Sequence, residues 1–265
     1  MVLRVLFSVA DALIARWRSV CDVAGIATLS VFSVVMPASW RRVPRGEFIR
    51  QFAAIGTEGA GFLLLAAVIV GVAMFMQGQV WLEHLGQEGT VRPLLIKLMI
   101  REVGPLLTMV ILIGRNGSAC TAELGEMSVS GEVSLLRSQG IDPFVFLVYP
   151  RVSAMSVAGL CLSILFIASA FMGAYLFAAC VGLARIDAFE HARRILEQVG
   201  PVEVINVLVK AVLPGLVAGA ICTRQGLGVA RAADIPSAVR RAHERSLAAV
   251  CVIDASVSVL SYAIM

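Results

Sequence analysis

Long stretches without a single charged residue are the feature that most limits what this chain can fold into. Between Glu58 and Glu83 lie 24 consecutive uncharged residues, and 33 more run from 152 to 184. A helix needs about 20 predominantly apolar residues to cross a bilayer. Charged residues make up only 15% of the 265 residues, whereas a soluble domain carries about 25%. The pattern therefore predicts an all-α integral membrane protein.

Five membrane-spanning helices are predicted from the apolar stretches. The stretch 152–184 is long for one tilted helix but too short for two helices and a turn, so it is assigned one span. No polar stretch is long enough for a second domain, so 46–265 is expected to form one membrane domain, preceded by an N-terminal helical segment over 1–45. The predicted spans are 59–82, 93–114, 152–184, 201–223 and 246–265.

The stretch 23–40 allows two interpretations. Its 18 uncharged residues are enough for a sixth span. However, arginines cluster at both of its ends, and basic residues gather on the cytoplasmic side of membrane proteins. A helix that lies in the interface keeps both clusters on that side, and we favour this interpretation.

The distribution of basic residues also sets an orientation. With five spans and a cytoplasmic N-terminus, the segments 1–50, 115–151 and 224–245 face the cytoplasm and hold 15 of the 22 Lys and Arg residues. This bias is typical of cytoplasmic loops, and it places the C-terminus on the periplasmic side. The formal net charge of +4 is too small to indicate nucleic-acid binding.

Besides Lys97 and Glu203, which lie near the ends of their spans, four ionisable residues fall inside the predicted spans, namely Arg101, Glu102, Lys210 and Asp254. Each costs at least about 2.5–3.5 kcal/mol on insertion scales, so such groups face a protein interior or a wet cavity. Neighbours on a helix point about 100° apart, so Arg101 and Glu102 cannot both face one partner. Two interpretations stay open: the four residues line a cavity, or they pair between helices.

Glycine and proline suggest how the spans pack and bend. Gly104-Pro105 and Pro214-Gly215 are expected kink sites in the second and fourth spans. Gly215 and Gly219 have the spacing of a small-residue pair that allows two helices to approach closely. Chance occurrence in a glycine-rich chain is an equally good explanation of that pair.

The motifs of an enzyme are missing. The sequence contains no GxxxxGK[ST] phosphate loop, so it cannot hydrolyse ATP through one. Its three histidines are isolated, and its six cysteines are scattered without a CxxC pair. We therefore predict no catalytic residue, no metal site and no cofactor in this chain.

The segment 115–151 is the most distinctive polar part of the chain. An amphipathic stretch over 126–139 is predicted there, with an apolar side that includes Leu135 and Leu136 and a polar side of Glu126, Glu132 and Arg137. A short helix of this kind can dock into the groove of a partner. An ordinary surface helix has the same pattern.

At this point the sequence resembles the MlaE/YrbE permease family, the membrane subunits of Mla- and Mce-type lipid ABC transporters. The resembling residues are REVGPLLTMVILIGRNGSACTAELGEM at 101–127 and GIDPFVFLVYPR at 140–151. Weaker matches extend the resemblance over about 45–265. Glu132-Val133 stands where the family often has Glu-Gln, and Ala238-Val239-Arg240-Arg241 stands where it commonly has Ala-Thr-Thr-Arg. Both departures lie where the resemblance implies that the ATPase docks.

The resemblance implies a homodimer in the bacterial inner membrane that holds phospholipid between its protomers and maintains the lipid distribution of the envelope. Its implied partners are a cytoplasmic ATPase that binds ATP and Mg, a periplasmic MCE-domain hexamer and a small STAS-type accessory protein. The implied coupling helix carries Glu126, Glu132, Leu135, Leu136 and Arg137. The expected lipid-cavity residues are Val72, Phe75, Met76, Gln79, Arg101 and Glu102.

Two other functions are weighed against this one. A secondary transporter could use the buried charges as a proton relay, but inverted repeats are expected in that class and none is visible in the sequence. A membrane scaffold without a transport role is the second alternative. Co-purification of an ATPase and an MCE-type protein would separate both from the permease.

Overall fold

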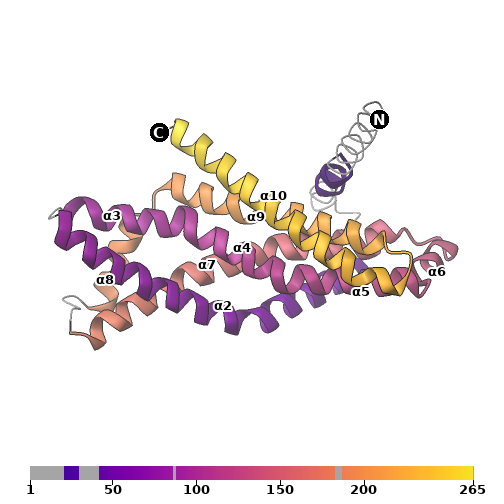
Figure 1. Ribbon diagram of the computed structural model, residues 1–265, viewed down its shortest axis with the longest axis horizontal. Coiled ribbons are helices and arrows are strands. Elements are labelled where there is room, and N and C mark those ends of the chain that lie inside the picture. Colours follow the sequence, from indigo (N-terminus) through magenta and orange to yellow (C-terminus); the bar gives the residue numbers. More distant parts are fainter. Residues whose placement is uncertain (1–20, 30–41, 86–87, 183–186, 265) are drawn as a thin grey trace, which may run out of the picture.

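The structure is a computed structural model that describes residues 21–29, 42–85, 88–182 and 187–264. The described residues form helices and no strands, as predicted, and they make an elongated bundle (Figure 1). In chain order the elements are a helix over 21–29, α2 (Arg42–Leu85), α3 (Glu88–Leu98), η2 (Met99–Val103), α4 (Gly104–Leu112), η3 (Ile113–Gly117), α5 (Ser118–Val129), α6 (Glu132–Ser138), η4 (Phe144–Val148), α7 (Tyr149–Cys180), α8 (Ala188–Glu197), α9 (Pro201–Leu227), η5 (Ala232–Asp234) and α10 (Ile235–Ile264).

Three of the described helices are long and apolar enough to cross a membrane. These segments are Gly59–Trp81, Phe144–Cys180 and Pro201–Leu227, which correspond to the first, third and fourth predicted spans. The second predicted span lies in the continuous helical path from α3 to η3, and the fifth lies in the second half of α10. The count of five spans thus stays a prediction.

Helix α7 packs between α2 and α9, and glycines set both contacts. A Cβ added at Gly71 of α2 would lie 2.0 Å from the carbonyl oxygen of Ala170 on α7. At Gly215 and Gly219 of α9, an added Cβ would lie 2.7 Å from Ser156 Cα and 3.0 Å from Val152 Cα. The predicted small-residue pair on α9 therefore does allow close approach of two helices.

The two expected kink sites behave differently. Directly before Gly104-Pro105 the chain forms the π-helical segment η2. The Gly104 N–H donates a hydrogen bond to the Met99 carbonyl, five residues earlier. Proline cannot donate to the helix ladder, so a wider turn in front of Pro105 is a common solution. Pro214 lies within a single uninterrupted α9. The kink expected there does not break the helix.

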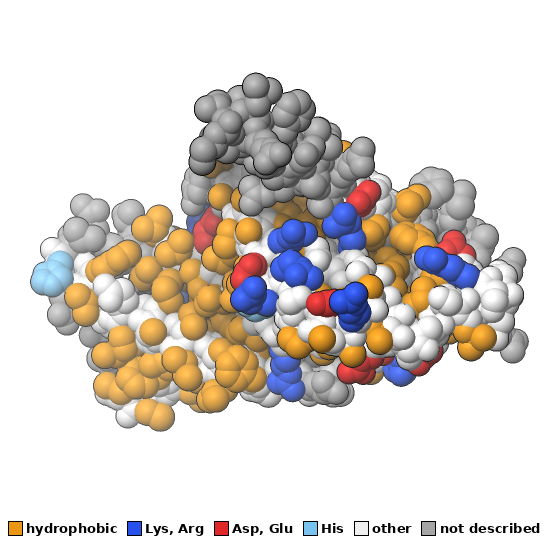
Figure 2. Space-filling model, turned by 45° about the vertical axis from the view of Figure 1, so that its right-hand side comes forward, with side chains coloured by type: hydrophobic (Ala, Val, Ile, Leu, Met, Phe, Trp, Pro, Cys, Tyr) orange, Lys and Arg blue, Asp and Glu red, His pale blue; other side chains and the backbone are white. Residues whose placement is uncertain are grey.

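Hydrophobic and charged side chains occupy different parts of the surface (Figure 2). Hydrophobic side chains cover the left part of that view, and Lys, Arg, Asp and Glu side chains gather toward the right. Within the candidate span of α2, Phe62, Leu65 and Ile69 follow one helix face and are 58–60% exposed. Such a stripe is expected where a helix faces lipid.

The described part of the N-terminal segment docks on the bundle. Asp22 pairs with Arg224 of α9 at 2.9 Å, and Ile26 packs in the apolar cluster of Val148, Val152 and Leu216. Most of the ambiguous stretch 23–40 lies outside the described residues, so the choice between an interfacial and a spanning helix stays a prediction.

Candidate functional site: two polar clusters

The four ionisable residues that lie farthest inside the predicted spans, Arg101, Glu102, Lys210 and Asp254, are found between η2, α9 and α10. The Lys210 side chain is fully buried, and its Nζ lies 2.5 Å from Glu102 Oε2 and 3.3 Å from Asp254 Oδ1. Lys210 also donates a hydrogen bond to Ser258 Oγ at 2.6 Å. A buried ammonium is tolerated only with such partners. For Lys210, the single chain therefore shows pairing between helices, which is one of the two interpretations left open by the sequence.

Arg101 belongs to the same group but has a different partner from Glu102. Its guanidinium donates to the Ser261 hydroxyl, and Asn206 Nδ2 donates to that hydroxyl at 3.2 Å. This agrees with the prediction that Arg101 and Glu102 cannot both face one partner. We refer to the following residues together as the outer cluster: Arg101, Glu102, Asn206, Lys210, Asp254, Ser258 and Ser261.

Three members of the outer cluster, Asn206, Ser258 and Ser261, were missed by sequence reasoning. A usable signal existed, because Ser258 and Ser261 follow Asp254 by four and seven residues and so share a face of α10. Asn206 precedes Lys210 by four residues on α9 in the same way. Small polar residues at helical spacing from a buried charge therefore indicate its partners.

The outer cluster keeps unused capacity to accept hydrogen bonds. Within the described residues, Glu102 Oε1 and Asn206 Oδ1 are buried without a hydrogen-bond partner. Buried polar atoms are nearly always paired, so an unpaired acceptor points to water or a ligand. The formal charges of Arg101, Lys210, Glu102 and Asp254 cancel, so a zwitterionic group could bind there without adding net charge.

The apolar part of the expected lipid cavity lies on α2. Phe75 meets Phe177 of α7 edge-on, with ring centroids 6.2 Å apart, and Met76 is 49% exposed. Val72 and Gln79 are half-buried. These four residues belong to the helix that packs mainly on α7, whereas the outer cluster joins η2 to α9 and α10. Lipid contact at either set of residues stays a prediction.

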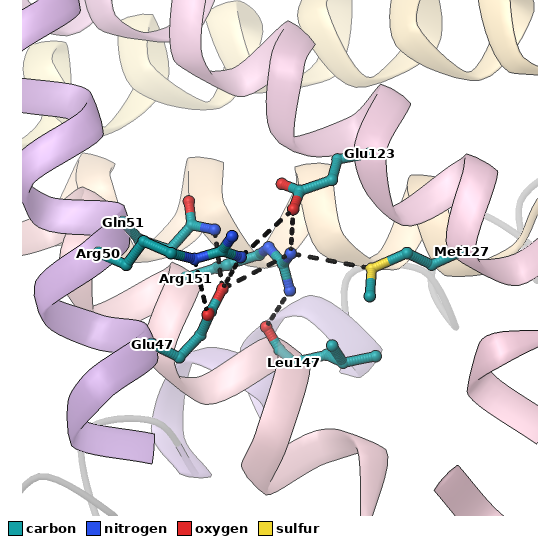
Figure 3. A network of polar contacts seen from close by, with 7 residues as sticks. All are labelled: Glu47, Arg50, Gln51, Glu123, Met127, Leu147 and Arg151. Atoms are coloured by element: carbon teal, nitrogen blue, oxygen red, sulfur yellow. Dashed lines mark hydrogen bonds and ion pairs between the residues drawn. The ribbon is translucent and has the colours of Figure 1, made fainter. Parts of the chain in front are cut away.

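A second polar cluster, absent from the sequence-based prediction, lies near the beginning of α7. Figure 3 shows the guanidinium of Arg151, on α7, between Glu47 of α2 and Glu123 of α5. Arg151 Nη2 lies 2.8 Å from Glu123 Oε1 and 3.8 Å from Glu47 Oε1. Its Nη1 donates to the Leu147 carbonyl at 3.2 Å. Together with Arg50 and Gln51, we call Glu47, Glu123 and Arg151 the inner cluster.

Glu47 is the most strongly bonded carboxylate of the inner cluster. It accepts hydrogen bonds from Arg50 at 2.8 Å and from Gln51 at 2.9 Å. Burial alone would raise its pKa, but these bonds and the charge of Arg151 outweigh burial and hold the pKa below the ordinary value of 4.5. A cavity of about 240 Å³ lies beside this cluster between α2, α5 and α7.

The predicted bounds of the coupling helix, 126–139, are wrong, because this stretch is divided between two helices, α5 and α6. Glu126 belongs to α5, which ends at Val129, and the other four predicted residues belong to α6. Between them Gly131 adopts φ 85°, a left-handed conformation that ends a helix and favours glycine. On α6, Leu135 is 58% exposed, Glu132 and Arg137 are exposed, and Leu136 is half-buried.

Helix α6 occupies one extreme of the bundle, away from α3 and α8 (Figure 1). None of its residues is buried, so its side chains are available to a partner. Among the described residues, no three His, Cys, Asp or Glu side chains gather as a metal site would require. The arrangement therefore offers a buried polar cluster and a protruding helix.

Comparisons with known proteins agree with this arrangement. Residues 48–260 match the family model described as Permease MlaE. A protein of Rickettsia conorii named as a probable ABC transporter permease is 26% identical over 83% of this chain and 85% of its own length. The intermembrane phospholipid transport system permease protein MlaE of Haemophilus influenzae is 33% identical over 47% of this chain and 48% of its own length. The chloroplast protein trigalactosyldiacylglycerol 1 of Arabidopsis thaliana is 29% identical over 80% of this chain and 58% of its own length.

Proposed function

This chain belongs to the MlaE permease family, and on that premise we propose that it is the membrane subunit through which an ATP-driven transporter moves phospholipid. The outer cluster is the observation that carries the proposal, because it buries charges and unpaired acceptors among apolar helices. Ionisable groups at such positions mark transport paths more often than not. The Haemophilus relative is named as a phospholipid permease, which agrees in substrate class.

The proposed assembly is a homodimer in the bacterial inner membrane with five spans in each protomer, a cytoplasmic N-terminus and a periplasmic C-terminus. ATP and Mg bind to a separate cytoplasmic ATPase, and a periplasmic MCE-domain hexamer exchanges lipid with the dimer. A STAS-type accessory protein completes the cytoplasmic side. Both the Rickettsia and Haemophilus relatives are named as permeases, which supports a separate energising subunit.

The outer cluster has the groups to hold a lipid headgroup. Arg101 supplies a cation for the phosphate, while Glu102 Oε1 and Asn206 Oδ1 can accept hydrogen bonds from headgroup donors. Val72, Phe75 and Met76 supply an apolar surface for acyl chains, with Gln79 at their polar edge. This division of polar and apolar surface is typical of sites for amphipathic ligands.

Helix α6 is proposed to transmit the motion of the ATPase. It protrudes from the bundle with Leu135 exposed between Glu132 and Arg137, which is the pattern of a helix that enters a groove. Closure of two ATPase copies would push the α6 helices of both protomers. Because α5 leads from α6 into the bundle, this push would reach the membrane part and change the volume open to lipid.

Lipid-stimulated ATP hydrolysis by the reconstituted complex tests the proposed function. Glu132→Gln combined with Arg137→Gln should lower that hydrolysis several-fold, because these changes remove both charges that flank Leu135. Arg193→Gln combined with Glu197→Gln is a matched control, since it removes one exposed ion pair on α8 at the other end. Wild-type hydrolysis in the α6 variant would remove the coupling role.

Co-purification separates the permease from the two rival functions. A tagged chain should bring down an ATPase and an MCE-domain protein in stoichiometric amounts. A secondary transporter would instead accumulate substrate on a proton gradient without either protein, and a scaffold would do neither.

A further inference from the structure

Helix α8 has an exposed apolar side that the proposed transport path does not use. Phe189 is 83% exposed and Leu196 is 70% exposed, and Ala192 between them is also exposed. These residues are three and four positions apart, so they lie on one side of the helix. Phe189 is the most exposed of the large hydrophobic side chains in the described residues.

The remaining surface of α8 is divided between charges and a contact with α7. Arg193 pairs with Glu197 at 3.0 Å, and Arg194 pairs with Glu190 at 3.1 Å, each one turn apart and well exposed. On the third side, the His191 ring lies 5.2 Å from the ring of Tyr175 on α7. α8 thus has one side against protein, one charged side and one exposed apolar side.

The position of α8 suggests what covers its apolar side. α8 lies in the short connection between Cys180, where α7 ends, and Pro201, where α9 begins. Figure 1 places it at the end of the bundle opposite to α6. The adjoining ends of the two spanning helices are also apolar and exposed, with Leu176 56% and Ile205 62% exposed. The apolar side of α8 therefore continues, along the chain, a surface that faces lipid.

We propose that α8 lies in the membrane–water interface on the periplasmic side, with Phe189, Ala192 and Leu196 inserted at the boundary between headgroups and acyl chains. Amphipathic helices with one charged and one aromatic or aliphatic side bind lipid surfaces in this way. Arg193 and Arg194 lie where lipid phosphates are found. The helix then anchors the outer ends of α7 and α9 at a fixed depth. The inference rests on the membrane placement in the proposed function.

Depth-dependent fluorescence quenching tests the proposal in the full complex in lipid nanodiscs. Phe189→Trp puts an indole on the apolar side of α8, and Glu197→Trp is the matched control on its charged side. The emission of the native tryptophans is subtracted with the wild-type complex. Lipids brominated near the top of the acyl chain should quench most of the emission added by Phe189→Trp, and aqueous iodide should quench that added by Glu197→Trp.

A third variant separates failure of this proposal from failure of the membrane placement itself. Ile69→Trp lies near the middle of the candidate span of α2 and should be quenched by lipids brominated deeper in the chain. If Ile69→Trp is quenched by lipid while Phe189→Trp is quenched by iodide, α8 projects into water and the proposal is overturned. Protection of Phe189→Trp from both quenchers only after the MCE-domain protein is added would also overturn it, in favour of a protein contact.

Discussion

The outer and inner clusters are built on the same plan but differ in what they leave unsatisfied. In each, a buried cation, Lys210 or Arg151, lies between two carboxylates from other helices. In the inner cluster, Glu123 is 41% exposed and reaches water. In the outer cluster both carboxylates are mostly buried, and Glu102 Oε1 has no partner among the described residues. In the inner cluster the buried atom without a hydrogen-bond partner among the described residues is a donor, Arg151 Nε. On this difference we base the proposal that the outer cluster binds a ligand and that the inner cluster is a structural joint.

The largest expected effect is at Lys210. Lys210→Met keeps most of the side-chain volume but leaves the buried Glu102 and Asp254 carboxylates without their cation. Removing one partner of a buried ion pair costs about 3–5 kcal/mol, and we expect that loss in the free energy of unfolding in detergent.

Neutralising the two carboxylates should reverse much of this loss. Lys210→Met combined with Glu102→Gln and Asp254→Asn removes the uncompensated charges and should recover stability, but not lipid binding. If the single and triple variants are equally unstable, the pairing of charge is not what stabilises this region.

A smaller effect is expected at the inner cluster. Arg151→Met removes the cation from Glu47 and Glu123, but Glu123 is 41% exposed, so water can replace part of the lost contact. The expected loss is about 1–3 kcal/mol, as for a broken charged hydrogen bond, measured in the same unfolding assay. A loss as large as that of Lys210→Met would show that the inner cluster is as dry as the outer one.

The inner cluster should also respond to acid. Because the pKa of Glu47 is lowered in the folded chain, its contribution to stability is fully present above its ordinary value of 4.5 and is lost as the pH falls through the folded pKa. The difference in unfolding free energy between wild type and Glu47→Gln should be constant from pH 7 to pH 5 and shrink below 4.5. A difference that grows on acidification would contradict the sign of this shift.

The smallest effect is expected for an ion pair that water surrounds. Arg193 and Glu197 are 66% and 58% exposed, and such helix pairs contribute only about 0.3–0.5 kcal/mol. Arg193→Gln should therefore change the midpoint of thermal unfolding very little. A shift comparable to that of Arg151→Met would mean that the polar side of α8 is covered in the assembly.

The sequence predicted the membrane architecture better than the polar contacts. Charge-free runs were sufficient for the helical class. The charges within them indicated that polar side chains would be buried, but not which of these side chains would contact one another. The inner cluster escaped because Arg151 directly precedes the long apolar run 152–184 and looks like an ordinary boundary residue. The break at Gly131 escaped because amphipathic spacing continues across it, and only the backbone angle shows the turn.

The central claim is that the outer cluster, and not the inner one, binds the phospholipid headgroup. Its most direct test is the amount of phospholipid that remains bound to the purified complex, counted by native mass spectrometry, for Arg101→Gln and for Arg50→Gln as the control in the inner cluster. We expect several-fold less bound phospholipid for Arg101→Gln and a wild-type amount for Arg50→Gln. Full retention of phospholipid by Arg101→Gln, or an equal loss in both variants, would contradict it.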